Sequence, residues 1–282
     1  MKIGLILAVS AISLFSGTVI WSTQKTIERP ASRADDEEKQ VLQPERRSAN
    51  HFFYPTGSIS TLYVNAPVAV ELDETFTGVE LYGDTSLFPK LQITDRHGIV
   101  NIGQRQYPKI IGKGPGPGKR WEYPDSIRQQ IQNADIRVRV GLGNSGAHHN
   151  RILDLKNCKN VAATTPVTGE RVTLNLFQVD STQLDLAVGG IQVYHSGGRA
   201  TFWLQLSGTA DQVFFSAGSW GNVDARRLQA REVYVRNAHH VEWDLYATEI
   251  ANLQGLDSCT VRLGGNPRYQ LIREGNDERR RR

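Results

Sequence analysis

The sequence predicts an all-β protein that forms a parallel β-helix, a solenoid-like coil with about twenty residues and two short strands per turn. Three observations predict it. One apolar row recurs every twenty residues, at Val193, Val213, Val233 and Leu253. A second row runs ten residues out of phase, at Trp203, Val223, Trp243 and Leu263. Short alternating strands separated by Gly and Asn corners fill the segments between, as a sharply turning sheet requires.

Composition places the chain among soluble globular proteins. It has 282 residues, enough for one large or two ordinary domains, with 39% hydrophobic and 22% charged residues. The net charge of +4 is small for this length. Since no long Lys/Arg stripe with interleaved aromatics appears, nucleic acid is not expected as a partner.

The N-terminus carries the targeting signal. Residues 3–21 follow Lys2 and contain no charged side chain, which fits either a cleaved signal peptide or an uncleaved membrane anchor. Either interpretation exports the rest of the chain to the periplasm or cell surface, tethered to the inner membrane if the segment is retained. Residues 22–50 are polar and charged, and we expect a disordered linker there.

The expected domain covers residues 51–271. Alternating strands begin at Ile59 and continue to Ile102, before residues 104–133 interrupt the rhythm as an insertion loop with one short helix near 126–131. From Ile152 to Leu263 a strand arrives about every ten residues. Residues 272–282 are polar, end in four arginines and are predicted to be a basic disordered tail.

Two cysteines, Cys158 and Cys259, are predicted to stay unpaired. They lie about five turns apart at roughly 4.8 Å per turn, whereas bridged Cα atoms lie within about 7 Å. We expect both to be small buried side chains of the coil.

An ordered set of motifs resembles the head GIN-domain family, whose members are described as putative autotransporter adhesins. The set opens with Val68-Ala-Val70-Glu-Leu72 and Val79-Glu-Leu81-Tyr-Gly83-Asp84, and closes with Val261-Arg-Leu263-Gly-Gly265-Asn266-Pro267. Between them lies a run of glycine-rich corners. The resemblance covers roughly residues 53–271 and implies a right-handed coil with two strands per turn. It carries over no catalytic residue, and the 104–133 insertion departs from it.

Several side chains are candidates for ligand binding. Trp121 and Tyr123, beside the glycine-rich part of the insertion, can either stack on a sugar or partner, or pack back on the coil. Trp220 lies in a corner and is the better candidate for an exposed contact, with Arg226 and Arg227 nearby as a basic patch or as solvated side chains. Trp203 and Trp243 are expected inside the coil.

Asp224 and Asp244 are the candidates for chemistry. They are twenty residues apart, so they are expected to stack on one outer face, either as a general acid/base pair or as solvated positions. The pairs His148-His149 and His239-His240 fit solvated corners better than a metal site, because neighbours on a strand point to opposite faces. No metal and no cofactor are predicted.

The preferred hypothesis is a non-enzymatic envelope module that binds polysaccharide or an envelope protein as an adhesin does, or acts as a scaffold. The ends of the coil can also stack on further copies, which would give a homo-oligomer. The alternative is a polysaccharide-active enzyme using the outer carboxylates. A third hypothesis is an assembly or stress-signalling partner at the inner membrane.

Overall fold

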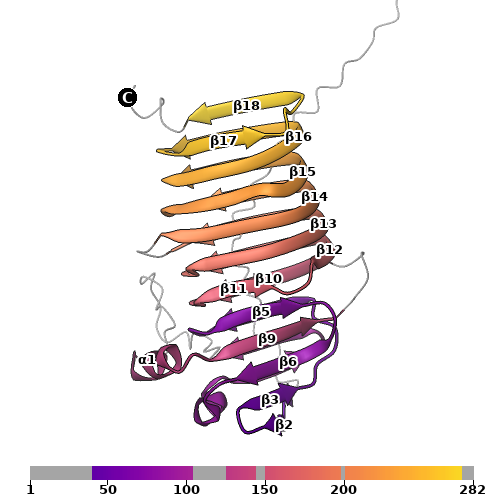
Figure 1. The fold of residues 1–282 in the computed structure, drawn as a ribbon, viewed down its shortest axis with the longest axis vertical. Helices are drawn as coiled ribbons and strands as arrows, with labels where there is room; N and C mark the ends of the chain where they lie inside the picture. Colours follow the sequence, from indigo (N-terminus) through magenta and orange to yellow (C-terminus); the bar gives the residue numbers. More distant parts are fainter. Residues whose placement is uncertain (1–39, 104–124, 144–149, 198–200, 275–282) are drawn as a thin grey trace, which may run out of the picture. The chain divides into compact units, whose positions relative to one another are not determined.

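The computed structural model describes residues 40–103, 125–143, 150–197 and 201–274, which all belong to one compact unit, Lys39–Arg282. These residues form a β-solenoid whose parallel strands stack roughly 20 residues apart. Figure 1 shows the strands of successive turns side by side, from β5 up to β18. The predicted fold class is confirmed.

Each turn of the coil contributes to two parallel stacks of strands. The strands are Thr61–Asn65 (β4), Ala69–Asp73 (β5), Asn150–Lys156 (β10), Asn160–Ala163 (β11), Val167–Phe177 (β12), Ser181–Ser196 (β13), Phe202–Ala217 (β14), Gly221–His239 (β15), Val241–Asp257 (β16), Thr260–Gly264 (β17) and Tyr269–Glu274 (β18). One stack runs through β4, β10, β12 and the C-terminal halves of β13 to β16, and ends at β18. The other runs through β5, β11 and the N-terminal halves of β13 to β16, and ends at β17.

The strands β13 to β16 are long and serve both stacks. The sequence predicts separate short strands at Phe202–Leu206 and Val213–Phe215, but β14 joins them into one strand of 16 residues. The join is possible because two consecutive outward residues, Asp211 and Gln212, carry the backbone round the bend between the inward Ala210 and Val213. The bend therefore needs no loop.

The turns do not stack in sequence order. The strands β8 (Ile99–Gly103) and β9 (Arg137–Leu142) lie parallel to β4 and β5 on one side, and β10 and β11 lie on the other side. The turn formed by β4 and β5 is thus enclosed by turns that follow it in the chain. The expected insertion connects β8 to β9, and its described part is the predicted helix, α1 (Asp125–Asn133).

Antiparallel strands extend the N-terminal end of the coil. They are β6 (Thr77–Tyr82) on β9, β3 (His51–Tyr54) on β6, β2 (Glu45–Ser48) on β3, β7 (Ile93–Arg96) on β8 and β1 (Gln40–Val41) on β7. The segment 22–50 that was expected to be a linker therefore contains two strands, β1 and β2, in its described part. The side chains of β2 are all exposed, so its ladder to β3 requires no apolar residues.

The interior is a stack of apolar rows, but the stacking register differs from the even spacing of the sequence. Val193 pairs with Phe215, 22 residues later, and Val235 pairs with Leu253, 18 residues later. The prediction that Trp203 lies inside is wrong: its side chain is 59% exposed, and Leu204 stacks on Val223 instead. A one-residue shift in register moves a side chain to the other face of a strand.

Two other expectations hold. Trp243 lies in the core, with its ring centroid 5.3 Å from that of Phe215. Cys158 and Cys259 are both free, as predicted. Cys158 is buried as expected, but Cys259 is only half-buried. Among the described helices none is long and apolar enough to cross a membrane, and the expected N-terminal segment 3–21 lies outside the described residues.

Candidate functional site

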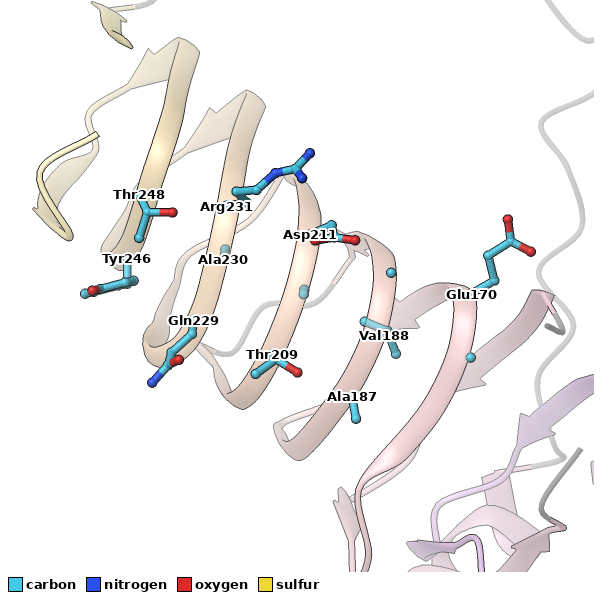
Figure 2. A pocket seen from close by; sticks show the side chains of 13 residues that line it. Glu170, Ala187, Val188, Thr209, Asp211, Gln229, Ala230, Arg231, Tyr246 and Thr248 are labelled. Atoms are coloured by element: carbon cyan, nitrogen blue, oxygen red, sulfur yellow. The ribbon is translucent and has the colours of Figure 1, made fainter. Parts of the chain in front are cut away.

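A groove of about 760 Å³ crosses the outside of the coil at the bend of the long strands. Figure 2 shows side chains from neighbouring strands lining it, with Ala187 and Val188 on β13, Thr209 and Asp211 on β14, and Gln229 and Arg231 on β15. Glu170 of β12 and Tyr246 with Thr248 of β16 complete the ends. Five consecutive strands therefore contribute to one surface that runs across the turns.

Small side chains leave this surface hollow. The exposed Ala187 pairs with Thr209, and Thr209 pairs with Gln229 on the next turn. Beside Ala187, Gly189 cannot be enlarged, because a Cβ there would lie 2.8 Å from the carbonyl oxygen of Glu170. The groove runs on from strand to strand because the buried residues beneath this surface also have small side chains.

That buried row stacks in register through the bend. Its members are Gly169, Val188, Ala210, Ala230 and Ala247, each paired with the next. Small residues at this position let the two stacks of strands approach each other at the bend. The groove is thus produced by a row of small residues that the twenty-residue spacing did not mark, since the offsets along it vary from 17 to 22.

The charges at the groove are mainly negative. Its charged lining residues are Glu170, Asp211 and Arg231. The guanidinium of Arg231 is already paired, with its Nε 3.4 Å from Glu249 Oε2 and its Nη2 3.5 Å from Glu232 Oε1. The charges of Glu170 and Asp211 are therefore not balanced by Arg231, because Glu249 and Glu232 already neutralise its guanidinium.

The corner around Trp220 presents a second exposed surface. Trp220 is 64% exposed, and its ring stacks on that of His240 with centroids 4.1 Å apart and planes 5° apart. The backbone of Trp220 is fixed, since its carbonyl oxygen accepts a hydrogen bond from Phe202 N at 3.1 Å. The predicted exposure of Trp220 agrees with this geometry, since the ring stays largely exposed although it stacks on His240.

A buried histidine supports this corner. His195 stacks on Phe202 with ring centroids 3.7 Å apart, and its Nδ1 lies 2.9 Å from Ser219 Oγ, next to Trp220. Burial lowers the pKa of His195 to about 4, because the low-dielectric surroundings disfavour the imidazolium. His195 is therefore a neutral packing element at ordinary pH, and its role at the corner is structural.

Asp224 and Asp244 are paired in register on consecutive turns, as the sequence spacing predicts. Each of the two carboxylates forms an ion pair with an arginine. Arg226 donates to Asp224 from Nε at 3.0 Å and from Nη2 at 2.8 Å, and Arg262 donates to both carboxylate oxygens of Asp244. The Nε of Arg226 also lies 3.8 Å from Asp244 Oδ2, so the four side chains form one chain of alternating charges.

This pairing decides what the carboxylates can do. The hydrogen bonds from Arg226 lower the pKa of Asp224 below its ordinary value. A general acid in glycoside hydrolysis needs a carboxyl with a raised pKa. The geometry around Asp224 is that of an ion-paired surface ladder. Arg227, which was predicted together with Arg226, is exposed and has no ion pair among the residues that the structure describes.

The remaining candidate residues are two aromatic side chains and two histidine pairs. Trp121 and Tyr123 lie outside the described residues, as do His148 and His149. Within the described part of the chain, no group of three or more His, Cys, Asp or Glu side chains could hold a metal ion. His239 Nδ1 lies 3.2 Å from Asp257 Oδ2, and His240 stacks under Trp220, so these histidines already have partners.

The fold and its surface define a β-solenoid with a lateral groove. A scan against protein-family models finds no match, and no curated protein matches the sequence. Solved structures do match. A putative adhesin from Bacteroides fragilis is 13% identical over 81% of this chain and 94% of its own, with a TM-score of 0.56, and has the same fold.

Two further solved structures align less closely. A protein described as a putative lipid binding protein from Parabacteroides distasonis is 16% identical over 81% of this chain and 96% of its own, with a TM-score of 0.47. A putative adhesin from Parabacteroides merdae is 11% identical over 78% of this chain and 94% of its own, with a TM-score of 0.39.

Proposed function

We propose that this protein is an exported cell-envelope module that binds an extended ligand along its coil and catalyses no reaction. The groove at the strand bend carries the proposal, because it crosses five consecutive strands, β12 to β16. A ligand lying in it would meet one turn of the coil after another. Chains of repeating units, such as polysaccharides or extended segments of envelope proteins, suit a surface that repeats in this way.

The charges of the groove limit the classes of ligand that it can bind. Glu170 and Asp211 face it without a compensating cation from Arg231, which is bound to Glu249 and Glu232. An acidic polymer would bring its carboxylates or sulfates close to these groups and would be repelled. We therefore favour a neutral or amine-bearing polysaccharide over the acidic glycan that the arginines near Trp220 would suggest.

The proposed location of the protein rests on its N-terminal segment. We infer that residues 3–21 export the chain and, if retained, tether it to the inner membrane with the coil in the periplasm. Mass spectrometry of the mature N-terminus from envelope fractions tests this, because a cleaved chain begins after residue 21 and a tethered one begins at residue 1 or 2. Membership of the head GIN-domain family, with an adhesin-like role, is part of the same proposal and is supported by the shared fold of the Bacteroides fragilis protein.

The alternative, a polysaccharide-active enzyme, would use Asp224 and Asp244. One observation favours it: the two carboxylates lie in register on one outer face. Against it, each is occupied by an arginine, and the pKa of Asp224 is lowered. Turnover of any polysaccharide that is lost in Asp224→Asn would establish the enzyme and overturn the binding proposal.

The binding test uses the full-length protein in detergent with four polysaccharides: laminarin, dextran, a soluble chitosan and alginate. Affinity electrophoresis of the wild type is compared with Ala187→Tyr, which fills the groove floor. Ser181→Tyr is the matched control, because Ser181 is also exposed on β13 but does not line the groove.

We expect retardation by laminarin, dextran or chitosan, at least a tenfold loss of affinity in Ala187→Tyr and none in Ser181→Tyr. Equal losses in the two variants, or retardation by alginate alone, would contradict a groove of this charge. Trp220→Ala tests the second exposed surface, the corner around Trp220. If Trp220→Ala loses affinity for the polysaccharide while Ala187→Tyr does not, the ligand binds at the corner and not in the groove.

A further inference from the structure

The C-terminal end of the coil is an uncovered rung of the core. Val261 and Leu263 of β17 stack on the buried Trp243 and Leu245, and Ile272 of β18 stacks on the buried Leu253. These three side chains occupy inward positions. Yet Ile272 is 44% exposed, and Val261 and Leu263 are only partly buried. Among the described residues, nothing lies above this rung.

The strands of this rung also have free edges. Both β17 and β18 pair with β16 on one side, and the described residues supply no partner on the other side. Figure 1 shows β18 as the last strand of the coil. Unpaired strand edges beside exposed apolar residues are templates for pairing with a further strand.

The opposite end of the coil is closed. Beneath β8 and β9 the sheets continue as antiparallel strands, and Leu87 and Phe88 of the 3-10 helix η2 (Thr85–Lys90) are buried there with Leu91 and with Ile131 of α1. Its outermost strand β2 exposes Glu45, Arg46 and Arg47. A charged, capped end cannot accept the apolar rung of another copy, so stacking of one end on the other is excluded.

The residues that follow the rung in the sequence carry no apolar side chain that could pack on it. Residues 275–282 have the sequence Gly-Asn-Asp-Glu-Arg-Arg-Arg-Arg and contain no apolar side chain. The rung requires apolar contacts above Ile272, Val261 and Leu263. A second copy supplies them, because its own last rung presents the same three side chains and the same free edges.

We propose that two copies of this protein associate through their C-terminal rungs, related by a two-fold axis, with β18 of one chain antiparallel to β18 of the other. A two-fold axis runs two identical strands antiparallel, which is a competent pairing for their edges. The contact uses the same patch on both chains, so it closes at the dimer. Since the other end is capped, no filament can grow.

The test measures the mass of the full-length protein in detergent by sedimentation velocity, over a concentration series. Two variants add charge to the rung, Ile272→Asp on β18 and Leu263→Asp on β17. Ile152→Asp is the matched control, because Ile152 is 39% exposed on the outer face of β10, away from both ends. Thermal melting confirms that each variant is folded.

We expect the wild type and Ile152→Asp to form dimers, and Ile272→Asp and Leu263→Asp to raise the dimer dissociation constant at least tenfold. A wild type that stays monomeric across the series would overturn the proposal. So would dimers that persist in both rung variants, or assemblies that grow beyond the dimer. A monomer that dimerises only after residues 275–282 are deleted would show that the tail covers the rung.

Discussion

Arg151 and Glu74 form a buried ion pair, with Nη2 of Arg151 2.9 Å from Oε2 of Glu74 across 77 positions of sequence. The same guanidinium donates to the carbonyl oxygens of Ile59, Leu142 and Gly143. The other oxygen of Glu74 accepts a hydrogen bond from Thr168 N at 2.9 Å. This pair joins the segments around β4, β5, β9 and β10, where the turns leave sequence order.

Removal of Arg151 is expected to be costly. Arg151→Met leaves the carboxylate of Glu74 buried without its cation, and loss of one partner of a buried pair costs about 3–5 kcal/mol. Urea unfolding of the full-length protein in detergent measures the change in free energy of unfolding. Arg171→Met is the control, because Arg171 is exposed on β12 and its replacement should stay within about 0.5 kcal/mol. Similar values for the two variants would contradict the role assigned to the pair.

Gly208 on β14 is expected to resist substitution. Its φ is 98°, in the region that favours glycine, and a Cβ there would lie 2.0 Å from the carbonyl oxygen of Leu186. Gly208→Ala should lower the free energy of unfolding by about 2 kcal/mol or more. At Gly218 a Cβ would meet nothing within 4 Å, so Gly218→Ala should be neutral or stabilise by up to about 1 kcal/mol. Thermal melts of the two variants side by side decide this.

Acid is expected to destabilise the fold through His195. Its pKa is about 4 in the folded protein and 6.5 as the ordinary value, so between these values the unfolded chain binds a proton that the folded chain does not. Stability is therefore full above pH 6.5 and falls as the pH drops towards 4, by about 2–3 kcal/mol at pH 4.5.

The variant His195→Phe isolates this contribution. A phenyl ring can keep the stacking on Phe202 but does not titrate. The loss of stability between pH 7 and 4.5 should be smaller in the variant than in the wild type by that amount, as measured by urea unfolding at both pH values. If stability falls equally with pH in the wild type and in His195→Phe, the pKa of His195 is not lowered in the folded protein.

The thiol of Cys158 is expected to be inert in the folded protein. Burial raises its pKa to about 12, and the thiolate is the reactive form. In a Cys259→Ser background, which leaves one thiol, a chromogenic disulfide reagent at pH 8 should label Cys158 at least a hundredfold more slowly in buffer than in urea. Fast labelling without denaturant would mean that the turn between β10 and β11 opens readily.

Much of the fold could be read from the sequence, because a coil repeats a local pattern. Inward alternation identifies the strands, and the period identifies the stacking, so Val213 and Val233 are correctly placed one above the other. Asp224 and Asp244 are also correctly placed. In both pairs the turn is twenty residues long, so a constant spacing of twenty residues identifies the correct partner.

Only part of the candidate site could be predicted from the sequence. Trp220 in its corner was marked by glycine beside an aromatic residue, and its exposure agrees. The groove was not found, although each long strand carries a signal for it. Pairs of outward residues such as Gly189-Gly190 and Asp211-Gln212 break the alternation and mark the bend. A single sequence does not reveal that these pairs align across turns of unequal length.

The sequence by itself determined that this chain winds into a coil of stacked strands, because strand alternation and glycine corners are local properties with a fixed repeat. Only the tertiary structure decided which turn lies on which. It placed β4 and β5 between later turns, moved Trp203 to the surface by a shift of one residue, aligned the small residues of the groove and left the rung of Ile272 open. Register is set by packing between segments far apart in sequence, and that packing has no local signature.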